Sequence, residues 1–297
     1  MKSRTLRVIA ATLVMYVGVA VLFLVVVTSS RRGGDGSQAL FGPRVAIVEL
    51  EGMILEVDDL VRELKSHREN PLVKALVIRI NSPGGVVAPT QEIHQALMRV
   101  REAGKPVVAS LGAVAASGGY YTAVAADRIL ANPGTLTGSI GVIMQMANVE
   151  NLFKKVGVEY VVVKAGQYKD LGSFSRPMTP EERRVLQTLL DDVHAQFIDA
   201  VAKGRKLDRA EVVKFADGRV FSGAQARDLK MVDTLGSLED AVNEAARLAG
   251  LSLPPAVIRP SKRFSIFDLV RSQLGLRGAL GLGAGLPSFR TLLYLMD

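Results

Sequence analysis

An uncharged and mostly aliphatic run extends from Val8 to Ser30. About 20 consecutive apolar residues suffice to cross a bilayer as a helix. A cleavable signal peptide has a shorter apolar core and a small-residue cleavage site, and no clear Ala-x-Ala sequence follows this run. The pattern predicts a transmembrane signal anchor over residues 8–30, after a basic tail at residues 1–7 and before a charged, glycine-rich linker at residues 31–43. A cleaved signal is the alternative.

Beyond Pro43, short apolar runs alternate with segments whose apolar residues recur with the helical period. The apolar runs predict strands over residues 45–50, 75–80, 106–111, 129–130 and 160–164. The periodic segments predict helices over residues 57–67, 91–103, 148–156, 179–203, 208–215, 222–229 and 238–248, with a turn at residues 218–222. Strands separated by helices of about 10–15 residues indicate crossover connections, and therefore an α/β fold with a mostly parallel sheet. In such sheets, catalytic groups gather at the carboxyl ends of the strands.

The net charge of +8 is concentrated at the two ends of the chain. Residues 1–34 hold five basic and no acidic residues, and residues 256–297 hold six basic and two acidic ones. Because these charges flank apolar segments, they favour an anionic membrane surface over a nucleic-acid groove. The chain has no cysteine and only three widely spaced histidines, which argues against disulfides, a thiolate nucleophile and a histidine-based metal site.

A candidate nucleophile lies where a predicted strand gives way to a predicted helix. The apolar run that begins at Val107 leads into small residues around Ser117, and Gly118 and Gly119 follow. A serine at a strand-to-helix turn has its hydroxyl at the end of a strand, and the amide of the next residue is free to donate. The alternative is a glycine-rich turn with a capping serine.

A serine nucleophile needs a base, and the sequence offers no obvious histidine. His194 lies in the middle of an amphipathic helix and is interpreted as a surface or structural residue, and His94 as a helix-face residue. A lysine can replace histidine where burial without a counterion disfavours its protonated form. Lys169 is the candidate, because it follows a predicted strand in a loop of small and polar residues. A surface lysine is the alternative.

Four short motifs occur in a fixed order along the chain. They are Asn-Ser-Pro-Gly-Gly ending at Gly85, Ala-Ser-Gly-Gly-Tyr-Tyr around Ser117, Thr-Gly-Ser-Ile-Gly-Val around Ser139, and Lys169-Asp170. Together with the N-terminal apolar run, these motifs resemble the signal peptide peptidase A family, in its short form with one catalytic domain. The resemblance covers about residues 44–250. It implies a fold similar to Clp protease and crotonase, a peptidase domain over residues 44–252 and a basic C-terminal extension over residues 253–297.

The resemblance also implies a Ser-Lys dyad. Ser117 would attack the peptide carbonyl, and Lys169 would remove its proton and later donate one to the leaving amine. Ser139 would hydrogen-bond the lysine and orient it, which is the role of the third residue in a catalytic triad. No cofactor and no metal are expected.

An oxyanion hole is implied by the two glycine turns. The backbone amide of Gly118 would donate one hydrogen bond, and Gly84 or Gly85 would donate the other. Glycines suit this place because the substrate must approach the backbone closely. The sequence does not decide between Gly84 and Gly85.

The resemblance further implies partners and a location. Short members of the family form membrane-facing octameric rings in which the lysine reaches the serine of a neighbouring protomer. Their substrates are cleaved signal peptides and other small hydrophobic or unfolded peptides, and the catalytic domain is extracytoplasmic, on the periplasmic side of the inner or plasma membrane. The slight excess of basic residues before the apolar run agrees with this orientation.

Two alternatives remain beside a membrane-anchored serine endopeptidase. A crotonase-type acyl-CoA enzyme would share the fold and the oxyanion hole, but a transmembrane anchor and a Ser-Gly-Gly turn argue against it. A catalytically silent membrane scaffold or regulator would keep the fold without the chemistry. Saturable binding of a CoA thioester without peptidase activity would favour the acyl-CoA enzyme, and no acylation of Ser117 by a serine-reactive probe would favour the scaffold.

Overall fold

The computed structural model describes residues 42–260 and 293–295. The predicted anchor at residues 8–30 and the basic tail lie outside these ranges, as does the linker up to residue 41. Within the described ranges, no helix combines the length and the apolar composition that a membrane span needs. The compact unit that carries the described fold begins at Arg44.

A mostly parallel sheet forms the centre of this unit, as the sequence predicts. The order of its strands is β7-β6-β4-β2-β1-β9. Strand β5 also pairs with β4, and β8 pairs with β5. All of these pairs are parallel except β6 with β7. The strands are β1 (Arg44–Glu51), β2 (Val73–Ser82), β4 (Val107–Ala116), β5 (Arg128–Ala131), β6 (Leu136–Gly138), β7 (Val220–Ser222), β8 (Thr234–Leu235) and β9 (Ala256–Ile258).

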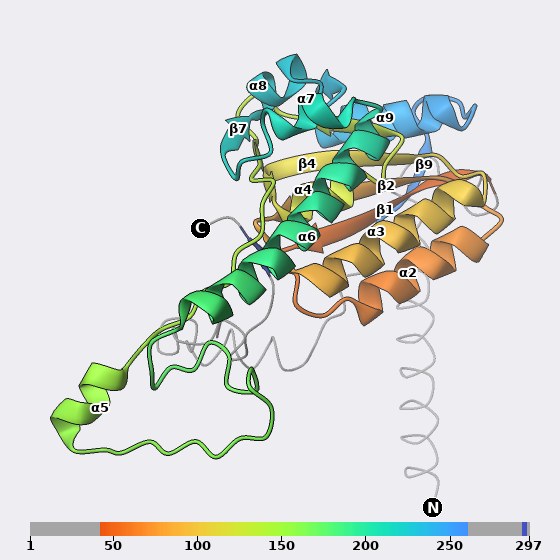
Figure 1. Ribbon diagram of the computed structural model, residues 1–297. Coiled ribbons are helices and arrows are strands. Elements are labelled where there is room, and N and C mark those ends of the chain that lie inside the picture. The colour runs from red at the N-terminus through yellow and green to blue at the C-terminus, as the bar shows by residue number, and fades with distance from the viewer. Residues whose placement is uncertain (1–41, 261–292, 296–297) are drawn as a thin grey trace, which may run out of the picture. The chain divides into compact units, whose positions relative to one another are not determined.

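Helices cover both faces of the sheet (Figure 1). On one face α3 packs on the sheet with α2 and α4 beside it, and α9 covers the other face. The helices are α2 (Asp58–Glu69), α3 (Val87–Glu102), α4 (Gly118–Ala123), α5 (Glu150–Val156), α6 (Pro180–Arg205), α7 (Arg209–Val213), α8 (Gly223–Asp228) and α9 (Leu238–Leu248). The mixed α/β architecture with a mostly parallel sheet is therefore confirmed.

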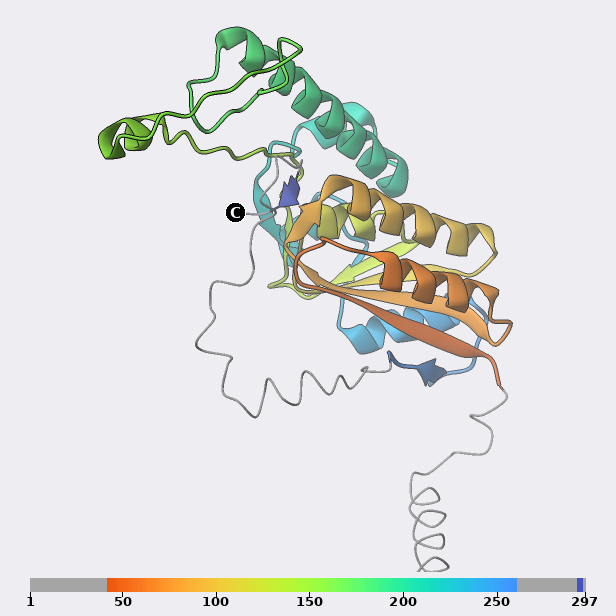
Figure 2. The same ribbon diagram turned by 90° about the horizontal axis from the view of Figure 1, so that it is seen from below.

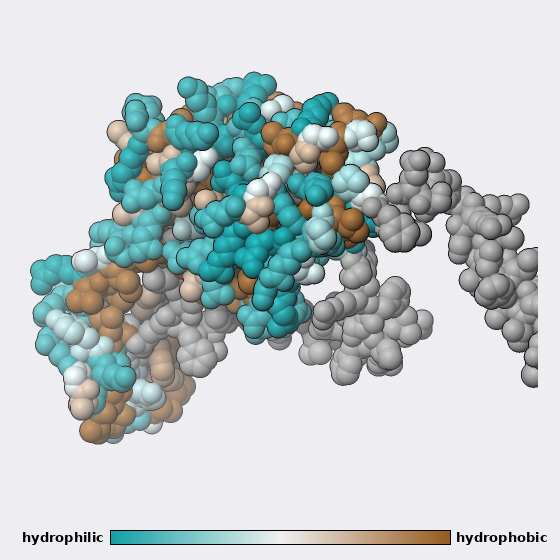
Figure 3. Space-filling view, turned by 90° about the vertical axis from the view of Figure 1, so that its right-hand side faces the viewer, coloured by the Kyte–Doolittle hydropathy of each residue, from teal (hydrophilic) through white to brown (hydrophobic). Residues whose placement is uncertain are grey.

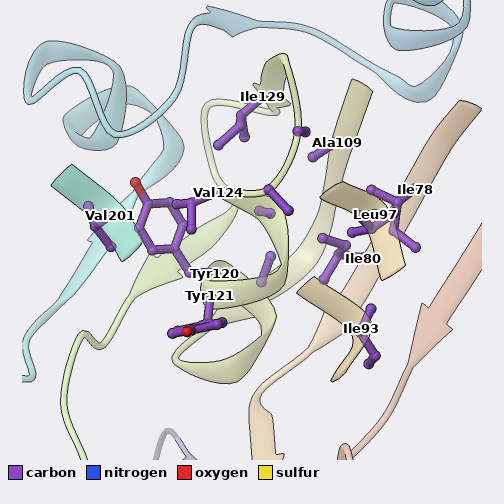
Figure 4. Close-up of a cluster of buried hydrophobic side chains, with 14 of the residues drawn as sticks. Ile78, Ile80, Ile93, Leu97, Ala109, Tyr120, Tyr121, Val124, Ile129 and Val201 are labelled. Atoms are coloured by element: carbon purple, nitrogen blue, oxygen red, sulfur yellow. The ribbon is translucent and has the colours of Figure 1, made fainter. Parts of the chain in front are cut away.

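Alternation along the central strands divides the core into two layers. On β2, Ile78 and Ile80 join the cluster on the α3 side, whereas Val77 joins the cluster on the α9 side. Figure 4 shows Ile93 of α3 beside the β2 side chains of the first cluster. Because successive side chains of a strand point to opposite faces, a strand buried on both faces is a nearly continuous apolar run. This explains why the central strands were easy to predict.

Short helix α4 is anchored in the first cluster by two tyrosines (Figure 4). The fully buried Tyr120 donates a hydrogen bond from its hydroxyl to the carbonyl oxygen of Met231, at 2.9 Å. Burial raises the pKa of Tyr120 well above its usual range, so the hydroxyl stays protonated. Tyr121 packs edge-on against Phe197 of α6, with ring centroids 5.0 Å apart. The start of α4 is thereby fixed on the sheet.

Long helix α6 begins with the capping box predicted from its sequence. The Thr179 hydroxyl accepts from the amide of Glu182, and the Glu182 carboxylate accepts from the amide of Thr179. Near its other end, Gly204 lies close to α4. A Cβ atom at Gly204 would lie only 2.2 Å from the carbonyl oxygen of Val124. Glycine at this position permits the close approach of the two helices.

Replacing Gly204 by alanine is expected to destabilise the fold by about 1–3 kcal/mol, the usual cost of overpacking. Alanine in a helix gains about 1 kcal/mol over glycine, but the contact is with backbone that must move. Urea unfolding followed by circular dichroism measures the change. Gly134→Ala is the control, because nothing lies within 4 Å of its added Cβ. Equal stability of Gly204→Ala and the unchanged protein would contradict this account.

Two predicted elements were wrong. Residues 160–164 form no strand, although three consecutive valines gave them strand propensity. No hydrogen bond joins the backbone of residues 159–163 to another described residue, so the segment lacks the neighbour that a strand needs. Residues 220–222, predicted as part of a turn, form β7, which pairs antiparallel with β6.

A short strand that was not predicted follows the first glycine motif. Strand β3 (Gly84–Val86) bridges to Ile54 on one side and pairs antiparallel with β10 (Leu293–Leu295) on the other. Figure 2 shows β10 beside the start of α3. The region that the sequence analysis assigned to the C-terminal extension thus supplies β9 to the main sheet and β10 to β3.

Candidate active site

Ser117 occupies the turn between β4 and α4, as predicted. Its backbone has φ 52° and ψ −116°, a region that non-glycine residues rarely adopt and that costs of order 1–3 kcal/mol. Its amide donates to the carbonyl oxygen of Gly138 at 2.8 Å, and its own carbonyl accepts from the amide of Tyr121. The surrounding hydrogen bonds therefore hold a strained turn in place.

The Ser117 hydroxyl is buried and has no hydrogen-bond partner among the described residues. Leaving a buried polar group unpaired costs about 1–3 kcal/mol, so such a group calls for an explanation. A strained backbone and an unpaired hydroxyl at the same residue are typical of a nucleophile held ready for reaction. A capping serine would instead accept a hydrogen bond from the first turn of the helix, and Ser117 makes no such bond.

The two glycine turns lie against each other. A Cβ atom on Gly118 would lie 3.2 Å from the Gly84 Cα atom and 3.2 Å from the Gly85 nitrogen. Gly118 is the first residue of α4, where backbone amides have no partner inside the helix. The turn that follows β2 and the Ser117 turn that follows β4 are thus brought together, as expected for the ends of neighbouring parallel strands.

The amides of Gly84 and Gly85 differ in their surroundings. The Gly84 amide donates to the Ser82 hydroxyl at 3.1 Å. The amide of Ile54 donates to the Gly84 carbonyl and the amide of Val86 donates to the Ile54 carbonyl, so Gly85 directs its own amide away from Ile54. A Cβ atom on Gly85 would lie 2.1 Å from the Ile54 carbonyl oxygen, which excludes any side chain there.

Ser139 lies next to the nucleophile turn, on the segment that follows β6. Its neighbour Gly138 accepts the hydrogen bond from the Ser117 amide, and the Ser139 amide donates to the carbonyl of Arg219 at 2.8 Å. Ser139 is buried and has a left-handed φ of 50°. It lines an open cavity of about 780 Å³ between the segment after β6, the middle of α6 and the turn before β7.

Lys169 is not part of this arrangement. It lies on the arm, which we define as residues 143–178, the stretch that includes α5 and projects away from the sheet (Figures 1 and 2). Its side chain is exposed, and within the described part of the chain no hydrogen bond or ion pair joins its ammonium to another group. The structure thus brings together Ser117, Ser139 and the three glycines, but it does not bring Lys169 to them.

An ionic network holds the backbone next to Lys169. Asp170 pairs with Lys164 and accepts from the Arg176 guanidinium at 2.8 Å. The same guanidinium donates to Glu182 at 2.9 Å, which connects the network to the start of α6. Hydrogen bonds from Arg176 and Lys164 hold the pKa of Asp170 well below its usual range, and Arg176 lowers the pKa of Glu182 to about 2. Sequence reasoning missed Arg176, because no local pattern connects it to the lysine.

Replacing Arg176 by glutamine is expected to loosen the segment around Lys169 without unfolding the domain. The carboxylates of Asp170 and Glu182 would lose their common partner, while the packed sheet would be unaffected. Limited trypsin digestion should then cut after Lys164 and Lys169 several times faster, while circular dichroism shows that the domain is still folded. Arg227→Gln is the matched control, because it removes an exposed pair with the adjacent Asp228. Unchanged digestion of the Arg176 variant would show that the network does not hold the segment.

Two histidines lie closer to the site than the sequence suggested. His94 is half-buried with its ring centroid 5.1 Å from that of Tyr121, and burial lowers its pKa to about 4. His194 lies on α6 and lines the same cavity as Ser139. Within the described ranges, no three His, Asp or Glu side chains are grouped so that they could hold a metal ion.

Comparison with known proteins gives consistent matches. The model of peptidase family S49 matches residues 99–252. A putative protease of Synechocystis sp. is 48% identical over 210 residues, which cover 70% of this chain and 75% of that protein. Protease 4 of Haemophilus influenzae is 35% identical over 223 residues, 72% of this chain and 36% of that protein. A putative signal peptide peptidase SppA of Enterococcus faecium is 36% identical over 185 residues, 62% of this chain and 54% of that protein. The chain therefore spans about three quarters of the Synechocystis relative but only about a third of Protease 4.

Proposed function

The chain belongs to peptidase family S49, and from this premise we propose that it is a membrane-anchored endopeptidase with Ser117 as nucleophile and Lys169 as base. That it is a serine-type peptidase follows from the family and its named relatives. The observation that carries the assignment of Ser117 is its strained turn and its buried, unpaired hydroxyl beside Gly118.

The arrangement supports acyl transfer at this turn. The Ser117 oxygen attacks the peptide carbonyl as its proton passes to the base, and the developing oxyanion accepts hydrogen bonds from backbone amides. Gly118 supplies one amide. Gly84 or Gly85 supplies the other: the Gly84 amide is bonded to Ser82, and the Gly85 amide faces the side of β3 on which β10 pairs. The protonated base then gives its proton to the leaving amine, and water releases the acyl group.

Strand β3 offers a way to hold an extended peptide. It carries Gly84 and Gly85, and its outer side accepts an antiparallel strand, as the pairing with β10 demonstrates. A substrate that took the place of β10 along this edge would present its backbone carbonyls close to the Ser117 turn. Recognition through main-chain hydrogen bonds tolerates many side chains, which suits a peptidase of broad specificity.

The base is proposed to come from a neighbouring copy of the chain. Lys169 is exposed on the arm and contacts neither Ser117 nor Ser139 within the described residues. The arm also exposes an apolar surface, with 73% of Val161 and 96% of Val163 accessible (Figure 3). Contiguous apolar surface of this kind is typical of contact with a partner. A ring, octameric by resemblance, would cover this surface and bring each lysine to the serine of the next protomer.

We propose hydrophobic peptides at a membrane as the substrates. The apolar run at residues 8–30 would anchor the chain as a single span in the inner or plasma membrane, with the catalytic domain on the extracytoplasmic side. Remnant signal peptides and other small apolar or unfolded peptides would then be within reach. The name of the Enterococcus faecium relative, putative signal peptide peptidase SppA, supports this substrate class.

Labelling of the nucleophile tests the assignment. Full-length protein in detergent is treated with a fluorophosphonate, digested, and analysed by mass spectrometry. The adduct is expected on the peptide that contains Ser117, and labelling of a Lys169→Ala variant should be at least about 100-fold slower. An adduct at another serine would refute the assignment. No adduct at all, in protein that is folded, would favour a catalytically silent scaffold with the same fold.

A further inference from the structure

The cavity beside Ser139 is lined by one stripe of α6. Gln187, Asp191 and His194 follow one another at helical spacing, and all three line the cavity that Ser139 also lines. Ser139 in turn lies next to Gly138, which holds the Ser117 amide. His194 and Ser139, the predicted lysine-orienting residue, therefore line the same cavity, next to the proposed nucleophile Ser117.

The His194 imidazole has a buried nitrogen with no partner. Its Nε2 atom is one of only three buried side-chain polar atoms that are unpaired in the described part of the chain, together with the Ser117 and Thr122 hydroxyls. Such a nitrogen costs about 1–3 kcal/mol unless something supplies the missing hydrogen bond. His194 lines the cavity but its Nε2 atom is inaccessible to solvent, so an occupant of the cavity supplies the bond only where the imidazole turns toward it.

We infer that His194 positions the amine of the catalytic lysine, a proposal that rests on the proposed Ser-Lys dyad. A neutral amine has two N–H bonds and one lone pair. If the Ser139 oxygen accepts one N–H and His194 Nε2 accepts the other, the lone pair is left to take the proton of Ser117. With the imidazole proton on Nδ1, Nε2 is an acceptor. His194 is then a positioning residue and exchanges no proton itself.

Two carboxylates, Asp191 and Asp217, also line this cavity, so the amine must bind away from them to stay a strong base. Asp217 pairs with Arg219, and the segment from Ser139 to Ile143, which follows β6, carries no titratable group. Asp191 is exposed and accepts from Gln187, and α4 presents Tyr121 to α6. A carboxylate next to the amine would stabilise its protonated form and weaken it as a base. The Ser139 hydroxyl, and an imidazole that accepts through Nε2, would hold the amine without that effect.

Three substitutions of His194 test the proposal in the full-length protein in detergent, with a fluorogenic apolar peptide as substrate. His194→Ala is expected to lower kcat about 10- to 100-fold and to leave KM within about 2-fold, as for other orienting partners. His194→Gln keeps an acceptor and should recover part of this loss. His194→Asp should move the acidic limb of the kcat/KM profile up by about one pH unit. His67→Gln on α2 is the control and should match the unchanged protein.

The outcomes separate this inference from the proposed function. Activity of all three variants within about 2-fold at every pH, with Ser117→Ala and Lys169→Ala inactive, overturns the role of His194 alone. A change in KM or thermal midpoint without a change in the pH profile also overturns it, because it indicates a structural role. Loss of activity in His194→Ala together with an active Lys169→Ala would make His194 the base and overturn both proposals.

Discussion

Replacing Ser117 by alanine is expected to reduce peptide cleavage by roughly 10⁴-fold or more, because removal of a nucleophile leaves only binding and oxyanion stabilisation. The fold should survive. The Ser117 hydroxyl has no hydrogen-bond partner in the described structure, so its removal breaks no bond and relieves an unpaired buried group. Cleavage of an apolar fluorogenic peptide and the thermal midpoint are measured on the same preparation.

A second unpaired hydroxyl on α4 provides the control for this experiment. Thr122 lies five positions beyond the nucleophile, and its buried hydroxyl also lacks a partner among the described residues. Thr122→Val removes that hydroxyl with little change of shape and should leave both activity and stability nearly unchanged. If Ser117→Ala kept more than a few per cent of the activity, with contaminating peptidases excluded, Ser117 would not be the nucleophile.

Replacing Lys169 by alanine is expected to cause a loss of similar size, roughly 10⁴-fold or more, because the nucleophile loses its base. The stronger result comes from co-expression of Lys169→Ala with Ser117→Ala. If each lysine serves the serine of the next protomer, random mixing should restore about a quarter of the sites, each built from one intact serine and one intact lysine. Each variant carries a different tag, and purification through both tags isolates the mixed oligomers. Their activity, relative to that of the unchanged protein, gives the fraction of restored sites.

A second lysine on the arm, Lys155, provides the control for Lys169→Ala. It tests whether activity is lost merely because the arm loses a positive charge. Lys155→Ala on α5 removes an exposed ammonium and is expected to keep full activity. Each inactive variant expressed alone should remain inactive. Mixed oligomers that stay inactive would mean that serine and lysine act within one chain, and that the arm must fold back for catalysis.

The central fold follows from the sequence because its pattern is local. Strands β1, β2 and β4 are nearly continuous apolar runs, and the stripe of α6, capped at Thr179, recurs with the helical period. The strand-to-helix turn at Ser117 was recognisable for a different reason. Only small residues fit where α4 approaches the turn after β2, and the sequence around Ser117 is made of them.

The features that could not be predicted from the sequence depend on contacts with residues far away in the chain. The valines of residues 161–163 have strand propensity, but no edge lies beside them in the described structure. Strand β7 is too short to show an alternation, and it exists because β6 lies next to it. His194 follows the buried Val193 directly, and one position of helical rotation decides whether a side chain faces the cavity or solvent.

Strand β4 has two neighbours on the same side, in succession. Residues Val108–Leu111 pair with β5, and Val114–Ala116 pair with the three-residue β6, which in turn pairs with the equally short β7 at the edge of the sheet. The Ser117 amide donates to Gly138 of β6, so the geometry of the Ser117 turn depends on the short strands β6 and β7 as well as on the core strand β4. Short edge strands open locally at a lower free energy than core strands. Thermal inactivation and thermal unfolding are therefore expected to occur at different temperatures. On heating, the activity should be lost before the core of the sheet unfolds.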